Sequence, residues 1–191
     1  MGSFYTNITL RTTDRERVAD LLRSDRRDAY VSPPANGCTV VFDRECEDQD
    51  TKVLNRLASS LSKQLGCPAL AVLIHDDDVL LYSLHEGGRL VDEYNSSPSF
   101  FDDSARSQLP SGGDAAQLCR AFGADDKVSA VEAVLRTPNG SREGFVFESD
   151  RHDKLVAALE LPTAAVATGY GYLEAGEFPD DTSESDYVHI S

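Results

Sequence analysis

The sequence predicts an α+β protein built around a ferredoxin-like βαββαβ unit over residues 4–76. Strand-like and helix-like segments follow one another in the order β-α-β-β-α-β. The last of these strands, residues 69–74, is apolar without alternation, which is typical of a strand buried on both faces. Two further strand-like segments, joined by Gly87-Gly88, then extend the sheet as an antiparallel meander over residues 78–96.

The first strand and the first helix are predicted within residues 4–24. FYTNITLR carries β-branched and aromatic residues in alternation, which is typical of a strand. Thr13 and Glu16 have the spacing of a capping box, in which the hydroxyl and the carboxylate each satisfy a free backbone N–H. The apolar residues that follow share one helical face, so we expect a helix from this cap to about Ser24.

A hairpin, a longer helix and a buried strand come next. DAYVSP is typical of a short strand, and Asn36-Gly37 favours a turn into a second strand, CTVVFD. DQDTKVLNRLASSLSKQLG has apolar residues at helical spacing, and Gly66 suits the left-handed residue that ends a helix. PALAVLIHD is the buried strand, and residues 75–78 (HDDD) should form the turn after it, because aspartate tolerates left-handed conformations.

Residues 97–176 are expected to cover the second face of the sheet. A polar connection carries Phe100 and Phe101 as aromatic anchors. GDAAQLCRAFG and DDKVSAVEAVLR predict two short helices, and GFVFES predicts a strand. A helix should then run from Asp150 to the stop at Pro162, and GYGYLEAG is expected to be a last short strand.

These segments predict one domain over residues 1–176, with 1–96 as the sheet-forming half and 97–176 as the covering half. The segment 177–191 is acidic, serine-rich and without lysine or arginine, so we expect a flexible tail. No stretch approaches the roughly 20 apolar residues of a membrane-spanning helix. The first residues lack the basic and apolar regions of a signal peptide, and we therefore expect a cytoplasmic protein.

The charge is distributed unevenly along the chain. The formal net charge is −15. Residues 1–66 hold ten Lys and Arg against ten Asp and Glu, whereas residues 67–191 hold eight against twenty-three. A polyanion would be repelled by the second part, which argues against nucleic-acid or anionic-membrane binding and favours a basic protein partner.

The four cysteines do not predict a zinc site. Cys38, Cys46, Cys67 and Cys119 include no C-x-x-C pair, and no histidine stands at the spacing of a zinc finger. We expect reduced thiols and no cofactor, with a divalent cation as the alternative.

That alternative rests on His75, Asp76 and Asp78, a cluster that could bind a hard cation through oxygen ligands. The spacing fails the EF-hand pattern, because Leu81 stands where glycine is required and Gly87 where glutamate is required. Consecutive side chains in an extended chain also alternate in direction. A solvated turn is the competing interpretation.

FESDRHDKL holds the most site-like group in the rest of the chain. Glu148 and His152 could form an acid/base pair beside Arg151, since an imidazole among carboxylates suits proton transfer. The competing interpretation is a capped helix with surface charges. Candidate binding residues, chosen because they combine polar and aromatic character, are Asp92, Tyr94, Asn95, Arg151, Tyr170 and Tyr172.

Three functional hypotheses follow. The first is a small non-catalytic interaction or regulatory module that uses its acidic part to bind a basic protein. The second is a metal-assisted hydrolase or other enzyme, in which the turn with His75, Asp76 and Asp78 meets Glu148 and His152. The third is a domain that senses a small ligand in a groove between the two halves.

Overall fold

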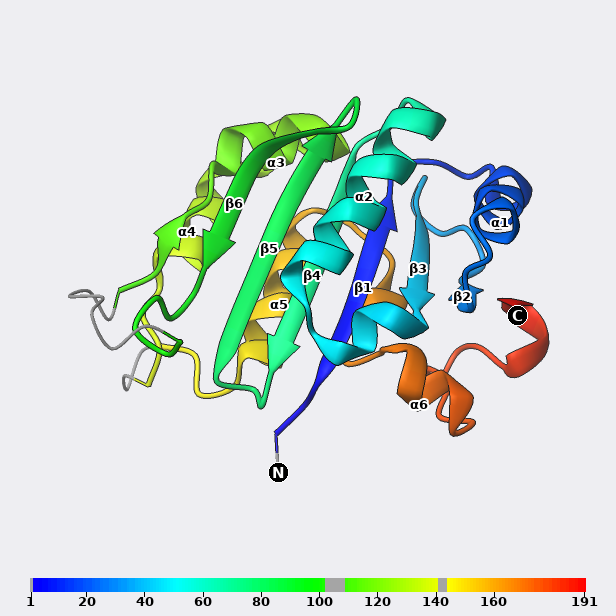
Figure 1. Ribbon diagram of the computed structural model, residues 1–191. Helices are drawn as coiled ribbons and strands as arrows, with labels where there is room; N and C mark the ends of the chain where they lie inside the picture. Colours follow the sequence, from blue (N-terminus) through cyan, green and yellow to red (C-terminus); the bar gives the residue numbers. More distant parts are fainter. Residues whose placement is uncertain (1, 102–108, 141–143) are drawn as a thin grey trace.

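The computed structural model describes residues 2–101, 109–140 and 144–191. Within these residues the protein is α+β, with six α-helices and an open antiparallel sheet of eight strands (Figure 1). The strands are β1 (Tyr5–Leu10), β2 (Ala29–Val31), β3 (Thr39–Asp43), β4 (Ala69–His75), β5 (Val79–Glu86), β6 (Arg89–Asn95), β7 (Ser111–Gly112) and β8 (Val188–Ile190). They lie side by side in the order β7-β6-β5-β4-β1-β3-β2-β8.

The helices lie on both faces of this sheet. They are α1 (Arg15–Ser24), α2 (Thr51–Leu65), α3 (Ala115–Phe122), α4 (Val128–Arg136), α5 (Glu148–Ala158) and α6 (Tyr170–Glu174). Two apolar clusters separate the faces: α1 and α2 pack on one, which we call the α2 face, and α3, α4 and α5 pack on the other, the α5 face (Figure 1). The apolar cluster on the α5 face joins side chains of the sheet to side chains of α3, α4, α5 and α6.

β4 is buried on both faces, as its apolar sequence predicts. It lies between β1 and β5. Ala69, Ala71 and Leu73 point to the α2 face, and the alternating residues Leu70, Val72 and Ile74 point to the α5 face. None of the six side chains is more than 2% exposed. Burial on both sides explains why this strand lacks polar alternation.

The turn after β4 is also as expected. Asp76 and Asp77 have φ values of 51° and 57°, in the left-handed region that aspartate tolerates. Gly87 and Gly88 form the next hairpin turn, with φ values of 57° and 81°. Both turns join neighbouring antiparallel strands, β4 to β5 and β5 to β6.

The predicted capping box at the start of α1 is wrong by one residue. The N-cap is Asp14, whose side chain accepts a hydrogen bond from the backbone N–H of Arg17. The carboxylate satisfies the free N–H of Arg17, whereas the hydroxyl of Thr13 was expected to bond the N–H of Glu16. The start of the helix is therefore set by Asp14, which lies between the two residues of the predicted capping box.

GFVFES does not form a strand. Phe145 makes only an isolated bridge to Asn139, and the helix α5 already begins at Glu148. Val146 and Phe147 are 69% and 53% exposed, so the apolar pattern of this segment does not mark a buried strand. The helix begins early because the N–H of Glu148 bonds to the carbonyl oxygen of Asp77.

GYGYLEAG is also not a strand, because its central residues form the short helix α6. The carboxylate of Glu47 accepts a hydrogen bond of 2.9 Å from the N–H of Tyr170 and so stabilises the start of this helix. A Cβ atom at Gly169 would lie 2.7 Å from a carboxylate oxygen of Glu47 and 2.9 Å from Cβ of Tyr5. Glycine is therefore needed where α6 meets β1, a packing requirement that strand propensity does not include.

The C-terminal segment, expected to be a flexible tail, ends in an edge strand. β8 pairs antiparallel with β2 through residues 188–190. Tyr187 and Ile190 are buried, and the ring of His189 stacks on Tyr30 with centroids 4.2 Å apart. The acidic residues 177–186 are followed by a short, more apolar segment, and this last segment pairs with the sheet. No helix among the described residues is long and apolar enough to cross a membrane.

Candidate functional site

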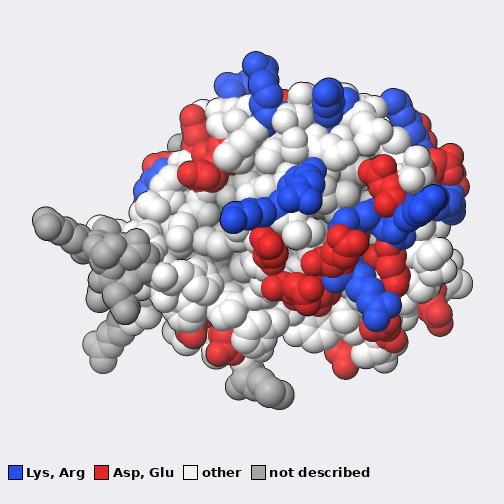
Figure 2. All heavy atoms as spheres, in the orientation of Figure 1, with Lys and Arg blue, Asp and Glu red and all other residues white. Residues whose placement is uncertain are grey.

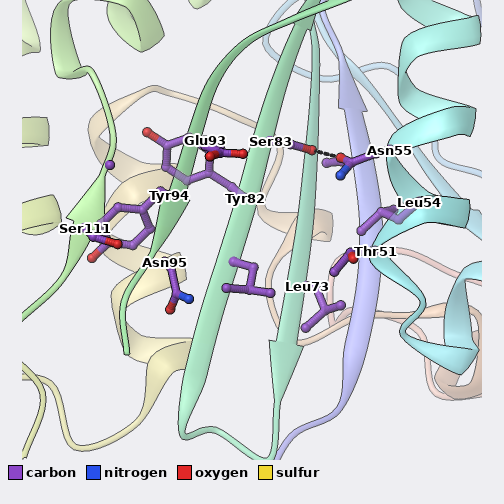
Figure 3. A pocket seen from close by; sticks show the side chains of 13 residues that line it. Thr51, Leu54, Asn55, Leu73, Tyr82, Ser83, Glu93, Tyr94, Asn95 and Ser111 are labelled. Carbon is purple, nitrogen blue, oxygen red and sulfur yellow. Dashed lines mark hydrogen bonds between the residues drawn. The ribbon is translucent and has the colours of Figure 1, made fainter. Parts of the chain in front are cut away.

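The candidate site is a groove on the α2 face, where β5 and β6 extend beyond α2. Its volume is about 380 Å³. It is lined by Thr51, Leu54, Asn55, Ala71, Leu73, Leu81, Tyr82, Ser83, Glu93, Tyr94, Asn95, Ser111 and Gly112 (Figure 3). We call it the sheet-face groove. α2 forms one wall, β4 and β5 form the floor, and β6 and β7 form the other wall.

The polar centre of the groove is the side chain of Asn55. The hydroxyl of Ser83 donates a hydrogen bond to the amide oxygen of Asn55 (Figure 3). Nε2 of His85 lies 3.3 Å from the same oxygen and donates to it. Burial lowers the pKa of His85, so its imidazole is neutral near pH 7. Ser83 and His85 thus donate to a shared acceptor rather than to each other, an arrangement that does not activate the serine as a nucleophile.

A second hollow, which we call the aromatic pocket, continues from the groove past the start of α2. Its volume is about 630 Å³. It is lined by Phe4, Glu47, Asp48, Gln49, Thr51, Leu73, His75, Leu81 and Phe101. Three of these residues also line the sheet-face groove, namely Thr51, Leu73 and Leu81. The two hollows are therefore contiguous.

The charges around these hollows are of one sign. Glu93 lines the sheet-face groove, and Glu47 and Asp48 line the aromatic pocket together with His75. Among the described residues, neither lining includes a lysine or an arginine. Figure 2 shows charged side chains of both signs gathered over α2 and the elements beyond it, whereas the surface over β5 and β6 carries fewer charged side chains, among them acidic ones.

Glu47 is the most constrained of these carboxylates. Burial raises its pKa, and hydrogen bonds from the backbone N–H groups of Tyr170, Gly171 and Thr6 oppose that rise. The carboxylate is therefore used mainly to hold α6 against β1. Asp48, beside it, is exposed and has its side chain available to a ligand.

The residues nominated as metal ligands do not converge. Nδ1 of His75 bonds to the amide oxygen of Gln49 at 2.6 Å, and Oδ1 of Asp76 accepts from the N–H of Gly2 at 2.9 Å. Asp78 is exposed at the end of the turn. No group of three or more His, Cys, Asp or Glu side chains within residues 2–101, 109–140 and 144–191 is arranged to hold a metal ion.

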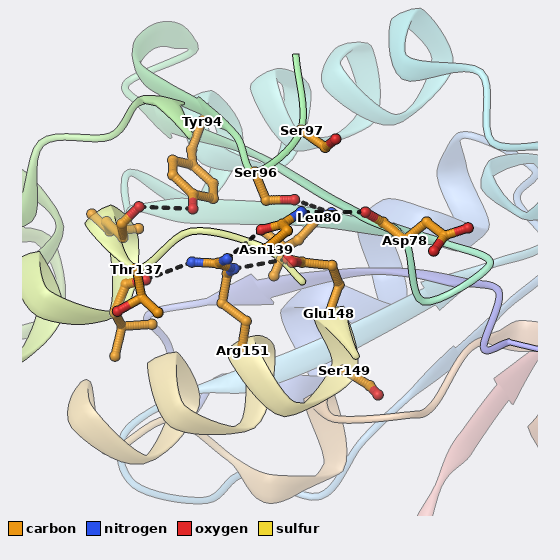
Figure 4. Close-up of polar contacts among 12 residues, drawn as sticks. Asp78, Leu80, Tyr94, Ser96, Ser97, Thr137, Asn139, Glu148, Ser149 and Arg151 are labelled. Carbon is orange, nitrogen blue, oxygen red and sulfur yellow. Dashed lines mark hydrogen bonds and ion pairs between the residues drawn. The ribbon is translucent and has the colours of Figure 1, made fainter. Parts of the chain in front are cut away.

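Glu148 and Arg151 form a buried ion pair in the first turn of α5, on the α5 face. Nε of Arg151 lies 2.8 Å from Oε2 of Glu148, and the two side chains are 0% and 2% exposed. Arg151 also donates to the carbonyl oxygen of Val134 at 2.7 Å and to Oδ1 of Asn139 at 2.5 Å (Figure 4). Burial raises the pKa of Glu148, and the charge of Arg151 opposes that rise. This cluster joins α4, the loop after it and α5.

His152 is buried beside the same helix turn. Its Nδ1 lies 2.9 Å from the hydroxyl of Tyr5, and burial lowers its pKa to about 4. The aspartate turn does meet α5, and the contact is made by Asp77, the middle aspartate of the turn. The proposed acid and base are thus close to the turn and shielded from solvent, where they could not reach a substrate.

The nominated binding residues separate into two groups. Tyr94 and Asn95 line the sheet-face groove. Asp92 instead accepts from the hydroxyl of Tyr82 at 2.7 Å and from the N–H of Asp114 at 2.9 Å. The other nominated residues are also used in packing: Arg151 in its ion pair, Tyr170 through a 2.7 Å hydrogen bond from its hydroxyl to Asp28, and Tyr172 against the apolar cluster of the α5 face.

Sequence reasoning missed Asn55, Ser83 and Glu93 in the groove and Phe4 in the pocket. The periodicity of the strand and the helix could have indicated some of these residues. Ser83 and Leu81 are two residues apart in a strand and therefore share a face. Thr51 and Asn55 are four residues apart in a helix and therefore also share a face. The sequence pattern does not show that helix α2 is too narrow to cover β5 and β6, so that this part of the sheet is open.

Comparison with protein-family models, with curated proteins and with solved structures finds no significant match to this chain.

Proposed function

We propose that this protein is a non-catalytic binding module that takes a basic, extended segment of a protein partner along the sheet-face groove and the aromatic pocket. The observation that carries the proposal is the lining of this continuous hollow. Its charged side chains are the carboxylates of Glu47, Asp48 and Glu93, and no lysine or arginine among the described residues lines it. The net charge of −15 acts in the same direction at longer range, because complementary fields raise association rates and select partners.

The groove has chemistry that suits an extended peptide. Asn55, Asn95 and Ser111 offer amide and hydroxyl groups on its walls, which can bond the N–H and C=O groups of a peptide backbone. Leu54, Leu73 and Leu81 offer apolar contacts to side chains that alternate with the basic ones. Binding of this kind needs no reacting group, in agreement with the shared acceptor of Ser83 and His85.

A small polar ligand in the groove alone is the second candidate. The specific observation in its favour is the groove volume of about 380 Å³, which falls within the usual range for small-ligand sites. A ligand held by Asn55 and Asn95 would use the same amides without entering the aromatic pocket. Peptide length separates the two candidates, since only an extended segment can contact both hollows.

We also propose the finer assignments of the fold and the compartment. The order β4-β1-β3-β2 with antiparallel pairing, and the placement of α1 and α2 between successive strands, support a ferredoxin-like unit as the first part of a single domain. Four free cysteines support a reducing, cytoplasmic compartment.

The test measures fluorescence anisotropy of labelled short peptides in which lysine alternates with leucine, against peptides in which glutamate replaces lysine. We expect the lysine peptides to bind and the glutamate peptides not to bind. Glu93→Gln should weaken binding about two- to fivefold, the usual effect of one exposed charge pair. Asp153→Asn is the matched control, because Asp153 is an exposed residue of α5 on the opposite face.

Salt provides the second criterion. Binding should weaken steadily as ionic strength rises, because the Debye length falls to about 3 Å at 1 M salt. Equal effects of Glu93→Gln and Asp153→Asn, or affinity that is insensitive to salt, would contradict the proposal. Binding of single amino acids or sugars with no gain from peptide length would support the small-ligand candidate instead.

A further inference from the structure

We infer that the aromatic pocket binds a quaternary or methylated alkylammonium group, supplied by a methylated lysine side chain of the basic segment. The part that concerns a peptide rests on the proposed function. The part that concerns the ammonium group rests on the pocket alone, and each can fail without the other.

The rings of the pocket stand at steep angles to one another. The centroids of Phe4 and His75 are 4.9 Å apart with an interplanar angle of 79°, and those of His75 and Phe101 are 5.3 Å apart at 69°. Phe100 packs against two of these rings, with its centroid 4.9 Å from that of Phe101 and 5.7 Å from that of His75. Rings that meet edge to face form walls of a cage, whereas parallel rings would cover one another's faces.

Two of these rings expose apolar surface to solvent, which is unfavourable in free energy. Phe4 and Phe101 are 41% and 58% exposed. Large apolar side chains grouped at an exposed hollow are typical of a binding surface. The pocket is therefore built to be covered when its ligand is present.

The carboxylates decide the sign of that ligand. Asp48 is exposed in the pocket lining, with Glu47 beside it. A purely aliphatic side chain would take the exposed carboxylate of Asp48 out of water without a partner, which is unfavourable. A cation satisfies the carboxylates and at the same time is attracted to the electron-rich faces of the aromatic rings.

Methylation is favoured because of hydration. The ammonium of an unmodified lysine is compact and strongly hydrated, so its transfer between aromatic rings is costly. A quaternary ammonium keeps the charge but presents methyl groups, which contact ring faces and are weakly hydrated. Recognition of such groups by aromatic cages is the usual functional role of cation–π contacts.

The cage is held in place before any ligand arrives. Nε2 of Gln49 donates to the carbonyl oxygen of Ile74 at 2.7 Å, so the amide oxygen of Gln49 faces His75 and accepts from its Nδ1 at 2.6 Å. Gln49 itself ends the 3-10 turn η1 (Arg44–Asp48), with its N–H bonded to the carbonyl oxygen of Cys46. The ring of His75 is thus fixed by the element that also supplies Asp48. Preorganisation of this kind lowers the cost of binding.

The first experiment titrates the ¹⁵N-labelled protein with tetramethylammonium chloride and follows backbone amide shifts. We expect saturable shifts at Phe4, Gln49 and His75. Sodium chloride at equal ionic strength and tert-butanol, an uncharged molecule of similar size, should not produce them. Equal shifts with tert-butanol would show an unspecific apolar hollow, and no saturable shifts with tetramethylammonium would also overturn the inference.

Variants locate the cation. Phe101→Leu should weaken tetramethylammonium binding about tenfold, and Phe101→Tyr should preserve it. Phe147→Leu is the matched control, because Phe147 is similarly exposed and lies outside the pocket lining. Unchanged amide shifts outside the pocket show that each variant is folded. Equal affinity in Phe101→Leu and Phe147→Leu would place the cation elsewhere and overturn the inference.

The second experiment compares peptides that carry trimethyllysine, lysine or norleucine at one position. Affinity should fall in that order, and Phe101→Leu should remove the difference between trimethyllysine and lysine. If tetramethylammonium binds but no peptide does, the pocket assignment holds and the proposed peptide function fails. If lysine and trimethyllysine peptides bind equally, the proposed function stands and the inference is overturned.

Discussion

Oδ1 of Asp77 accepts a hydrogen bond from the backbone N–H of Ser149 at 3.1 Å, and the carbonyl oxygen of Asp77 accepts from the N–H of Glu148 at 2.9 Å. The residue before the helix, Phe147, provides no side-chain cap. The turn between β4 and β5 therefore caps α5 from across the structure, and it does so with the middle aspartate of the three.

This relationship predicts that Asp77→Ala lowers the free energy of unfolding by about 1–2 kcal/mol, the usual cost of losing a helix cap. Alanine also fits poorly at the φ of 57° found here. Asp77→Asn, which keeps an acceptor oxygen and tolerates that backbone, should lose less. Asp78→Ala is the control and should change stability little, because its side chain is exposed. Urea unfolding of the three variants measures these differences.

The same carboxylate predicts a pH dependence. Burial raises the pKa of Asp77, but hydrogen bonds from Ser149 and Ser3 outweigh it, so the pKa lies below its ordinary value. A carboxylate of this kind stabilises the fold above the pKa of the unfolded chain, near 4, and loses that contribution as the pH falls further. The stability difference between the wild type and Asp77→Asn should therefore shrink below about pH 4. A difference that stays constant down to pH 2.5 or so would show that charge on Asp77 is not involved.

The buried ion pair of Glu148 and Arg151 predicts an asymmetric effect of mutation. Arg151→Met should destabilise the fold by about 3–5 kcal/mol, because it leaves a buried carboxylate without its partner. The double variant Glu148→Leu with Arg151→Met should recover part of that loss, since no unpaired charge remains. Arg23→Met, which breaks the exposed pair with Asp20, is the matched control and should cost less than about 1 kcal/mol. A double variant less stable than Arg151→Met alone would contradict the argument.

β8 predicts that the last residues matter for stability. Deletion of residues 187–191 removes two buried side chains, those of Tyr187 and Ile190, and should cost about 3–5 kcal/mol. It also leaves the edge of β2 unpaired, so the truncated protein should self-associate more, as size-exclusion chromatography can show. Deletion of Ser191 alone, which is exposed, is the control. A truncated protein that unfolds at the same urea concentration as the wild type would mean that β8 adds nothing to the fold.

The order of elements could be predicted where one local pattern decides the structure. The apolar run of β4 required burial on both faces, and the glycines and aspartates of the two hairpin turns required left-handed backbone. The errors lie where a distant residue decides. α5 begins at Glu148 because of Asp77, and α6 forms where Glu47 meets the N–H of Tyr170. No window of sequence around either helix contains its partner.

The candidate site shows the same division. Alternation along β5 and β6 places Ser83 and Glu93 on one face, and this pattern is visible in the sequence. That this face is open depends on the width of the sheet relative to α2, which is a tertiary property. Charged and histidine-containing stretches drew attention to Glu148 and His152 instead. In the structure both are buried, because Glu148 is paired with Arg151 and His152 bonds to the hydroxyl of Tyr5.

His152 predicts how stability depends on pH between 6.5 and about 4. Burial lowers its pKa from an ordinary value of 6.5 to about 4. Between those two values the unfolded chain binds a proton on this imidazole and the folded protein does not, so stability falls as the pH is lowered. The fall should reach about 3 kcal/mol across this window. Urea unfolding at pH 7 and at pH 4.5 or so measures most of it.

Two variants separate burial from hydrogen bonding as the cause of this fall. His152→Gln removes the titrating group while its amide oxygen can still accept from the hydroxyl of Tyr5, so stability should depend less on pH than in the wild type. Tyr5→Phe removes the 2.9 Å hydrogen bond to Nδ1 but leaves the imidazole buried, so the dependence should remain. If His152→Gln falls as steeply as the wild type, the imidazole must be protonated in the folded protein. It would then have access to solvent, and acid/base chemistry with Glu148 would again be possible.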